Sequence, residues 1–332
     1  MKYAAYFLEF DTPLHFGCGE NGGKLETASL GYRADTLFGA LCCELADYGD
    51  QTGLERLYQQ AKNGKLLFSD LFPYTIEKDG KGDIELFLPK PIRPLERTAP
   101  HELPSFDELK KDATREKSKK KMAYIRVSQL EDFLLGKEQE WDQPGNGMSQ
   151  VVTRVNCQGE QPRPYYVQEN VLPAHSGLYG ILAYEEKEDR EWILDLLKKL
   201  GITGIGGKRS SGLGKFHFGE DWIDLQEPFS SDDMVLSKLL QAEGKWAMNL
   251  SVLLPCTEEE VSTVKSGYYT LLKRSGFLSP DGNPVQKKQD IYMLQSGSCF
   301  PKRIQGTIAD VSWQADHHHV WRYGKGLFIG LG

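Results

Sequence analysis

The chain has 332 residues, of which 39% are hydrophobic and 26% are charged, and its mean hydropathy is −0.48. This composition is typical of a soluble globular protein of about two domains, and no apolar run approaches the ~20 residues of a membrane span. The formal net charge is −7, so a phosphate-rich partner has to be bound by a local basic patch. Residues 1–13 carry two acids, Glu9 and Asp11, where a signal peptide would be apolar, which predicts a cytoplasmic protein without a membrane partner.

The first elements read as a strand, two helices and two further strands. Residues 3–10, YAAYFLEF, are apolar on both faces and predict a buried strand. Residues 34–49 carry apolar side chains at helical spacing, with Asp35 placed to favour the helix dipole, and a second amphipathic helix follows. Residues 65–74 and 85–94 read as strands that end at prolines, which exclude helix there.

The middle of the chain departs from this regular pattern. Residues 107–126 are dense in lysine, and two interpretations stay open: a solvated, partly mobile surface segment, or a basic surface in which Lys119, Lys120 and Lys121 contact RNA. A P-G-N-G turn signal at 144–147 precedes residues 151–169, which predict a hairpin or extended excursion from the body.

The elements that follow are more regular. Residues 177–184 predict a buried strand, and residues 188–200 predict an amphipathic helix that ends at Gly201. A glycine-rich segment comes next, and residues 215–219 then alternate as a strand does.

The last third reads as a separate unit. Residues 221–244 are acidic and form a predicted domain connection. Residues 245–254 alternate as a half-buried strand, and several short strands follow to residue 331. Because strict βαβα alternation is missing, we expect an α+β fold with antiparallel sheets.

The cysteines predict neither a metal site nor a disulfide framework. They lie at positions 18, 42, 43, 157, 256 and 299, without a C-x-x-C pair. In a chain of this length the spacing argues against a zinc site and against a disulfide framework. We predict free thiols, mostly in the core.

The segment GITGIGGKRSSGLGKF, residues 201–216, is the strongest candidate site because it holds six glycines and three basic residues. A Walker loop is excluded because Arg209 follows Lys208 and Ile202 stands where the first glycine is required, and no dinucleotide fingerprint fits, so no nucleotide cofactor is expected. The segment leaves a helix C-terminus, whose partial negative charge repels phosphate.

An anion at this segment would therefore be held by backbone N–H groups of a glycine nest. Lys208 and Arg209 and the hydroxyls of Ser210 and Ser211 would assist. A tight structural connector is the alternative.

This segment also resembles the glycine-rich loop of the RAMP superfamily of CRISPR-associated proteins. Further pieces, in family order, are similar to the branch that supplies the fourth Csm subunit of type III-A effector complexes. These pieces are LHFG at 14–17, LFSDLFPY at 67–74, LFLPKPI at 86–92, KKKMAYIRVSQLEDFLLG at 119–136, LLKRSGF at 271–277 and RYGKGLFIG at 322–330.

The resemblance implies two ferredoxin-like (RRM-type) modules, namely residues 1–220, with an insertion at about 93–165 and a glycine-rich loop at 201–214, and residues 245–332. It implies a non-catalytic subunit that holds the repeat-derived 5′ tag of the CRISPR guide RNA. The implied protein partners are the large polymerase-like signature subunit and the adjacent RAMP backbone subunit.

Carried over residue by residue, the resemblance places RNA contacts on the loop and on a thumb-like hairpin. The hairpin departs from relatives, which tend to carry a second arginine soon after the first, whereas this chain reads RVNCQGEQPRP. The implied contacts are Gly204, Gly206, Gly207, Lys208, Arg209, Ser210, Ser211, Gly212 and Gly214 in the loop, with Arg154 and Arg163 in the hairpin, and we add His15 as a phosphate donor.

An enzymatic alternative also follows from the resemblance, since some RAMP proteins are metal-independent ribonucleases that process guide RNA. The best catalytic set in this chain is His15 with Lys208 or Tyr32, because the ordinary pKa of histidine suits acid–base catalysis. The run His317–His319 invites a metal hypothesis, but adjacent strand residues point to opposite faces, so an exposed loop is favoured.

Overall fold

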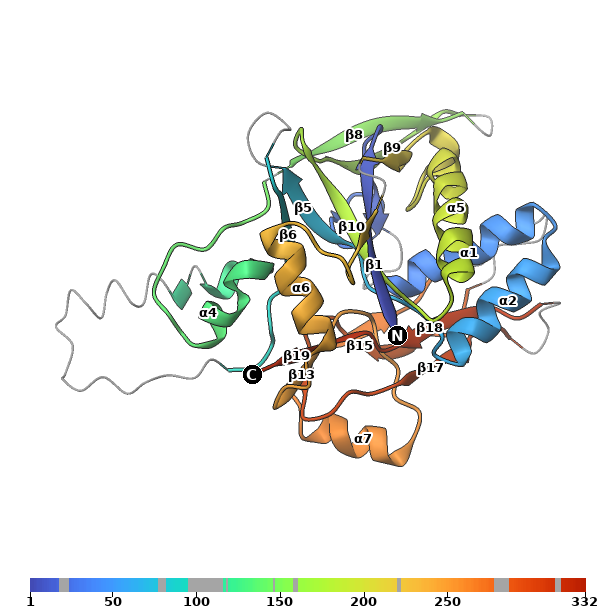
Figure 1. The fold of residues 1–332 in the computed structure, drawn as a ribbon. Helices are drawn as coiled ribbons and strands as arrows, with labels where there is room; N and C mark the ends of the chain where they lie inside the picture. Colours follow the sequence, from blue (N-terminus) through green and yellow to red (C-terminus); the bar gives the residue numbers. More distant parts are fainter. Residues whose placement is uncertain are drawn as a thin grey trace.

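The computed structural model describes residues 1–17, 24–76, 82–94, 116–117, 119–145, 147–157, 161–219, 222–277, 287–313 and 318–332. An antiparallel sheet of eight strands runs through the N-terminal two thirds, in the order β11-β1-β10-β5-β6-β7, with β12 also beside β1 and β4 also beside β10 (Figure 1). Its strands are β1 (Lys2–Phe10), β4 (Leu66–Phe68), β5 (Phe72–Ile76), β6 (Ile84–Pro89), β7 (Tyr124–Arg126), β10 (Ser176–Tyr184), β11 (Phe216–Phe218) and β12 (Ile223–Asp224).

The central strand β1 buries side chains on both faces of this sheet. Ala4, Tyr6 and Leu8 belong to one hydrophobic cluster, and Ala5 and Phe7 to another, because successive strand residues point to opposite faces. The first cluster is completed by α1 (Ala34–Asp47), α2 (Gln51–Lys62) and α5 (Lys187–Thr203), and the second by η2 (Val127–Gln129), α4 (Leu130–Leu134) and α6 (Ser231–Gln241). A strand covered on both faces is apolar throughout, as the sequence of β1 is.

The C-terminal third adds smaller antiparallel sheets and helix α7 (Glu258–Lys265), which lies at the bottom of the view in Figure 1. Part of this third packs into the core of the N-terminal part. Tyr323 packs against Phe38 of α1 with ring centroids 5.3 Å apart, and its hydroxyl accepts the N–H of Phe68 at 2.9 Å. The strands are β13 (Trp246–Asn249) between β16 (Cys299–Phe300) and β19 (Phe328–Leu331), β14 (Leu271–Arg274) with β15 (Ile291–Leu294), and β17 (Gly306–Asp310) with β18 (Trp321–Lys325).

A long hairpin, β8 (Met148–Asn156) and β9 (Arg163–Val171), forms a separate antiparallel pair at the top of the view in Figure 1. The base of the hairpin is tied to the body, because Leu14 and Asn170 exchange backbone hydrogen bonds of 2.7 and 2.8 Å. A short pair, β2 (Phe16–Gly17) and β3 (Ala28–Ser29), contacts the hairpin, because the N–H of Ala28 donates to the side-chain oxygen of Gln168 at 2.9 Å.

The predicted α+β class with antiparallel sheets is confirmed, as are the strand at 3–10, the helix at 34–49 and the hairpin after residue 147. The segment predicted as a domain connection contains β12, which pairs with β1 in the main sheet, and α6, which packs on one face of that sheet. The division into two ferredoxin-like modules stays a prediction. Among the described residues, every helix is too short or too polar to cross a bilayer.

Three local expectations are wrong. Gly201 does not end α5: the helix continues to Thr203, and a Cβ on Gly201 would lie 2.3 Å from the carbonyl oxygen of Phe216, so this glycine permits close packing. Strand β13 is not half-exposed, because Met248 and Ala247 pack into clusters on opposite sides. Of the five free cysteines in the described part of the chain, Cys299 alone is buried, and Cys18 lies outside that part.

Candidate nucleic-acid interface

The glycine-rich loop joins the end of α5 to the edge strand β11, in the order helix, loop, strand that the sequence predicts. Gly204 caps the helix with φ 85°, and its N–H donates to the carbonyl of Leu200 at 2.7 Å. A single 3-10 turn, η3 (Arg209–Ser211), forms the tip of the loop, and Lys208 immediately before it adopts a left-handed conformation with φ 62°. A left-handed conformation is costly for a residue with a Cβ, so the surrounding loop must hold Lys208 in place.

Much of the loop backbone is fixed by internal hydrogen bonds. Ile205 donates to Gly214 at 2.9 Å, Gly214 donates to Pro13 at 2.9 Å, and Gly207 donates to His15 at 2.8 Å. Amides that bond in this way are not available to a ligand. The amides of Lys208, Arg209 and Ser210 donate to no backbone carbonyl of the described residues, as expected at the start of a helical turn. The nest expected from the sequence is thus reduced to the tip.

Glycine is required where the loop meets the body. Gly214 has φ 76°, and a Cβ there would lie 1.9 Å from the carbonyl oxygen of Ile205. Gly206 has φ 92°, and a Cβ there would lie 2.7 Å from the carbonyl oxygen of His15. Both contacts are impossible for a real side chain, so these glycines allow the loop to pack against itself and against His15, directly before β2.

Exposure divides the loop into two parts. Gly204, Ile205, Leu213 and Gly214 are buried and act as a connector, which is the structural alternative considered from the sequence. The tip is open: Ser210 and Ser211 are exposed, and the residues between Gly206 and Arg209 are half-buried. The surface that a ligand could reach is therefore the two cations, the two hydroxyls and the neighbouring amides.

His15 and Tyr32 lie behind the loop. His15 is 4% exposed, its Nδ1 lies 2.8 Å from the carbonyl oxygen of Gln168, and its backbone carbonyl accepts the amide of Gly207. Tyr32 is 3% exposed, and burial raises the pKa of its hydroxyl, although Arg209 and the amide of Gly206 oppose this shift. Both side chains support the loop from within.

The hairpin contacts the loop through Lys208, whose Nζ lies 4.6 Å from the ring centroid of Tyr165 in β9. Arg154 in β8 forms an ion pair of 2.6 Å with the buried carboxylate of Glu169, while Arg163 is exposed at the start of β9. The structure thus brings the loop and hairpin together. The lysines at 119–121 lie elsewhere, where Lys90 donates to the carbonyl of Lys119 at 2.8 Å; residues 107–115 and 118 lie outside the described residues.

A cavity of about 280 Å³ adjoins the loop at Gly206, Gly207 and Arg209, and its charged lining was missed by sequence reasoning. The signal was present, because Arg274 lies in LLKRSGF and Arg322 begins RYGKGLFIG, two of the family-like pieces. The charged side chains that line the cavity are Arg33, Asp35, Arg209, Arg274, Lys288 and Arg322.

Asp35 organises this cavity. Sequence reasoning assigned it only to the helix dipole, but its side chain is fully buried and accepts hydrogen bonds from Arg274 at 2.9 and 3.0 Å and from Arg322 at 2.8 Å. Burial would raise the pKa of Asp35, but the two guanidinium groups outweigh burial and hold the pKa below its ordinary value. The carboxylate is therefore charged and fixes both arginines in the wall of the cavity.

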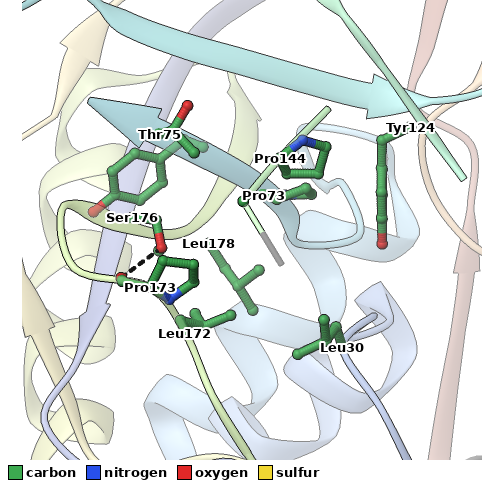
Figure 2. Close-up of a pocket in the computed structure, with 12 residues that line it drawn as sticks. Leu30, Pro73, Thr75, Tyr124, Pro144, Leu172, Pro173, Ser176 and Leu178 are labelled. Carbon is green, nitrogen blue, oxygen red and sulfur yellow. Dashed lines mark hydrogen bonds between the residues drawn. The ribbon is translucent and has the colours of Figure 1, made fainter. Parts of the chain in front are cut away.

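A second recess, of about 40 Å³, is shown in Figure 2. Its lining is mostly apolar, with Pro73, Pro144 and Pro173 around it, and Ser176 donates its hydroxyl to the carbonyl of Pro173 at 2.7 Å. Its lining among the described residues carries no charged side chain. It has neither the size nor the charge to hold a nucleotide.

The histidine run gives no metal centre in the described part of the chain, where no group of three potential ligands converges. The carboxylate of Asp310 accepts a hydrogen bond of 2.6 Å from Nδ1 of His319, and the His319 ring stacks on Trp321. His317 lies outside the described residues.

Comparison with known proteins gives the class. The RAMP superfamily model matches residues 7–217, more than half of the chain, and the CRISPR Csm4 C-terminal domain model matches residues 242–331. The chain belongs to the RAMP superfamily. The two matches together make it a Csm4-like RAMP protein, as the resemblance in its motifs predicted.

Two related proteins are similar to this chain over its full length. The CRISPR system Cms protein Csm4 of Streptococcus thermophilus is 29% identical over 333 residues, covering 100% of this chain and 99% of the relative. The protein of the same name from Mycobacterium tuberculosis is 28% identical, with 100% and 98% covered.

Solved structures share the fold. A Csm3–Csm4 subcomplex of the type III-A CRISPR-Cas interference complex matches with a TM-score of 0.62 and 16% identity, covering 100% of both chains. A Csm1–Csm4 cassette in complex with cA4 matches with a TM-score of 0.59 and 18% identity, covering 100% of this chain and 98% of the other.

Proposed function

We propose that this protein is a non-catalytic, RNA-binding subunit of a type III-A CRISPR-Cas interference complex, and that it holds the repeat-derived 5′ tag of the guide RNA. Membership of the RAMP superfamily and the full-length similarity to Csm4 proteins support the assignment to such a complex. Because the structural neighbours occur with Csm1 and with Csm3, we assign the corresponding large and backbone subunits as its partners.

The observation that carries the RNA-binding role is the tip of the glycine loop. Lys208 and Arg209 stand there on a backbone fixed by hydrogen bonds to Pro13 and His15, with two exposed serine hydroxyls beside them. Cations that are already positioned lose little entropy on binding a phosphate, and hydroxyls and amides supply further donors. The overall charge of −7 does not oppose this contact, because repulsion beyond about 8 Å is screened at physiological salt.

The modular organisation forms part of the same proposal. Residues 1–220 and 245–332 would be the two ferredoxin-like modules, and the β8–β9 hairpin would serve as the thumb. Two features support the thumb: the exposed arginine Arg163 near the far end of the hairpin, and the contact of Lys208 with Tyr165, which allows one strand of RNA to run from loop to hairpin. Arg154 would position Glu169 and the hairpin base, since its charge is already paired.

The ribonuclease alternative is disfavoured by the same geometry. A general acid or base must reach the proton that it transfers, and His15 is nearly fully buried with Nδ1 directed to a backbone carbonyl. The raised pKa of Tyr32 keeps that hydroxyl protonated, so it cannot serve as the base. Lys208 is the one member of the set at the open tip.

The test is to isolate the protein from its host and sequence the small RNAs that accompany it. We expect RNAs with one uniform, repeat-derived 5′ end, and loss of these RNAs from the variant Lys208→Ala, Arg209→Ala. The matched control is Lys198→Ala, Lys199→Ala, which removes two exposed charges from α5 on the same chain. RNAs with random ends, or equal retention by both variants, would contradict the proposal.

A further inference from the structure

The cavity beside the glycine loop carries more positive charge than the protein neutralises. Five cations line it, and the neighbouring carboxylates that pair with them are Asp35 and, through a 2.9 Å ion pair with Arg33, Asp70. Three positive charges therefore remain uncompensated among the described residues. They belong to Arg209, to Lys288 and to the pair of arginines that share Asp35.

Two side-chain nitrogens at this cavity also lack hydrogen-bond partners among the described residues. Arg322 is 6% exposed, and its Nε forms no hydrogen bond with the described residues. Lys288 is half-buried beside it, and its Nζ forms neither a hydrogen bond nor an ion pair with the part of the chain that the structure describes. Burial and then the charge of Arg322 lower the pKa of Lys288, so the ammonium is destabilised where it stands. A bound anion would satisfy both groups.

The shape and chemistry of the cavity restrict that anion. A volume of about 280 Å³ is close to the lower limit of small-molecule pockets and exceeds the space that one inorganic ion fills. Guanidinium groups match phosphate oxygens through paired hydrogen bonds, and a phosphate monoester carries nearly two negative charges. Phe16 and Tyr32 supply aromatic walls, and Gly206 and Gly207 line the cavity without side chains that would fill it.

We propose that this cavity binds a nucleoside phosphate, with the phosphate group against Arg322, Lys288 and Arg209. The source can be a nucleotide of the strand held on the loop tip, in which case the inference rests on the function proposed above, or a free nucleotide. The site joins the two halves of the chain, because Arg209 comes from the loop and Arg322 and Lys288 from the C-terminal third. Binding of the ligand is therefore coupled to the packing of β14 and β18 on α1.

The test is calorimetric titration of the full chain with AMP, inorganic phosphate and adenosine. We expect AMP and phosphate to bind and adenosine not to bind. Lys288→Met should weaken AMP binding about tenfold, because a hydrogen bond to a charged group is lost. The control is Lys287→Met, which removes the same charge one residue away from an exposed side chain and should leave AMP affinity within about twofold.

The variant at 288 is chosen because it removes a repulsive charge, so the free energy of unfolding in urea should not decrease. AMP binding that Lys288→Met leaves unchanged, or the absence of binding by wild type at millimolar AMP, would overturn the inference. Oligonucleotides distinguish the sources: if the strand fills the cavity, bound guide RNA blocks AMP, and if a free nucleotide fills it, both bind together.

A variant at Lys208 tests the proposed function separately from this inference, because Lys208 does not line the cavity. Lys208→Ala should weaken retention of guide RNA and leave AMP affinity unchanged. Normal AMP binding with unchanged RNA retention would contradict the tag-holding function alone. Normal RNA retention by wild type without AMP binding would contradict the cavity site alone.

Discussion

Asp35 and Arg274, 239 positions apart in the sequence, form a two-pronged buried ion pair in which Nε and Nη2 of the arginine lie 2.9 and 3.0 Å from the two carboxylate oxygens. The pair connects the first turn of α1 to strand β14. It holds the N-terminal and C-terminal parts of the chain together at the wall of the charged cavity.

Replacing this carboxylate should therefore cost much more than replacing a surface one. Asp35→Asn leaves Arg274 and Arg322 buried without a counter-charge, and we expect the free energy of unfolding in urea to fall by about 3–5 kcal/mol. The control Asp195→Asn breaks an exposed pair with Lys199 and should change stability by less than about 0.5 kcal/mol. Equal, small effects of both substitutions would show that the buried pair is not a stabilising connection.

The same carboxylate should produce a defined pH dependence. The pKa of Asp35 is lower in the folded chain than the value of about 3.9 in an unfolded one. Its contribution to stability is therefore complete above about pH 4 and is lost as the pH falls through the lower, folded-state pKa. The stability difference between wild type and Asp35→Asn should be constant from pH 7 to about 5 and shrink as the pH falls below 4. A difference that grew toward low pH would mean that the folded-state pKa is raised.

Substitution of two glycines in the loop distinguishes the cost of backbone strain from the cost of a steric clash. Gly212 has φ 86° and open space where a Cβ would lie, so Gly212→Ala should cost about 1 kcal/mol, the penalty of a left-handed conformation. Gly214 has a similar φ of 76°, but its Cβ would collide with the carbonyl of Ile205, so Gly214→Ala should cost about 2–4 kcal/mol. Thermal and urea unfolding of the two variants measure this order. The reverse order would mean that the loop does not pack against Ile205 as described.

The ribonuclease alternative can be tested with the isolated chain, outside any complex. The purified chain, incubated with repeat RNA and EDTA, should give no specific product, and His15→Ala should behave identically, because the imidazole is buried. Gel analysis of end-labelled RNA over several hours is sufficient. Specific cleavage that His15→Ala abolishes would establish the ribonuclease alternative instead.

Local sequence patterns predicted the elements well and the charged cavity not at all. The apolar run of β1 and the helical spacing of α1 are properties of neighbouring residues, so they are readable along the chain. The position of the glycine loop between a helix and a strand is equally local. The pairing of Asp35 with Arg274 and Arg322 depends on how β14 and β18 pack on α1, and no periodicity encodes that contact.

The same reason explains the wrong expectations. Strand β13 alternates small and large side chains, as a half-exposed strand does, but a second cluster covers its other face through Ala247. The glycine nest was expected over the whole loop, whereas the amides of Gly207 and Gly214 donate to His15 and Pro13, carbonyls about 200 residues away. Partners that arrive from distant segments decide which amides stay open.

The most direct test of the account is the salt dependence of guide-RNA binding at the loop tip, measured by fluorescence anisotropy with labelled 5′-tag RNA at about 50–200 mM salt. If Lys208 and Arg209 each contact one phosphate, the double alanine variant should bind more weakly, and the slope of log K against log[salt] should be reduced in magnitude by about 1.4, at about 0.7 per contact on single-stranded RNA. The control Lys198→Ala, Lys199→Ala should keep the wild-type slope. An unchanged slope and affinity in the loop variant would contradict the claim that this tip holds the RNA.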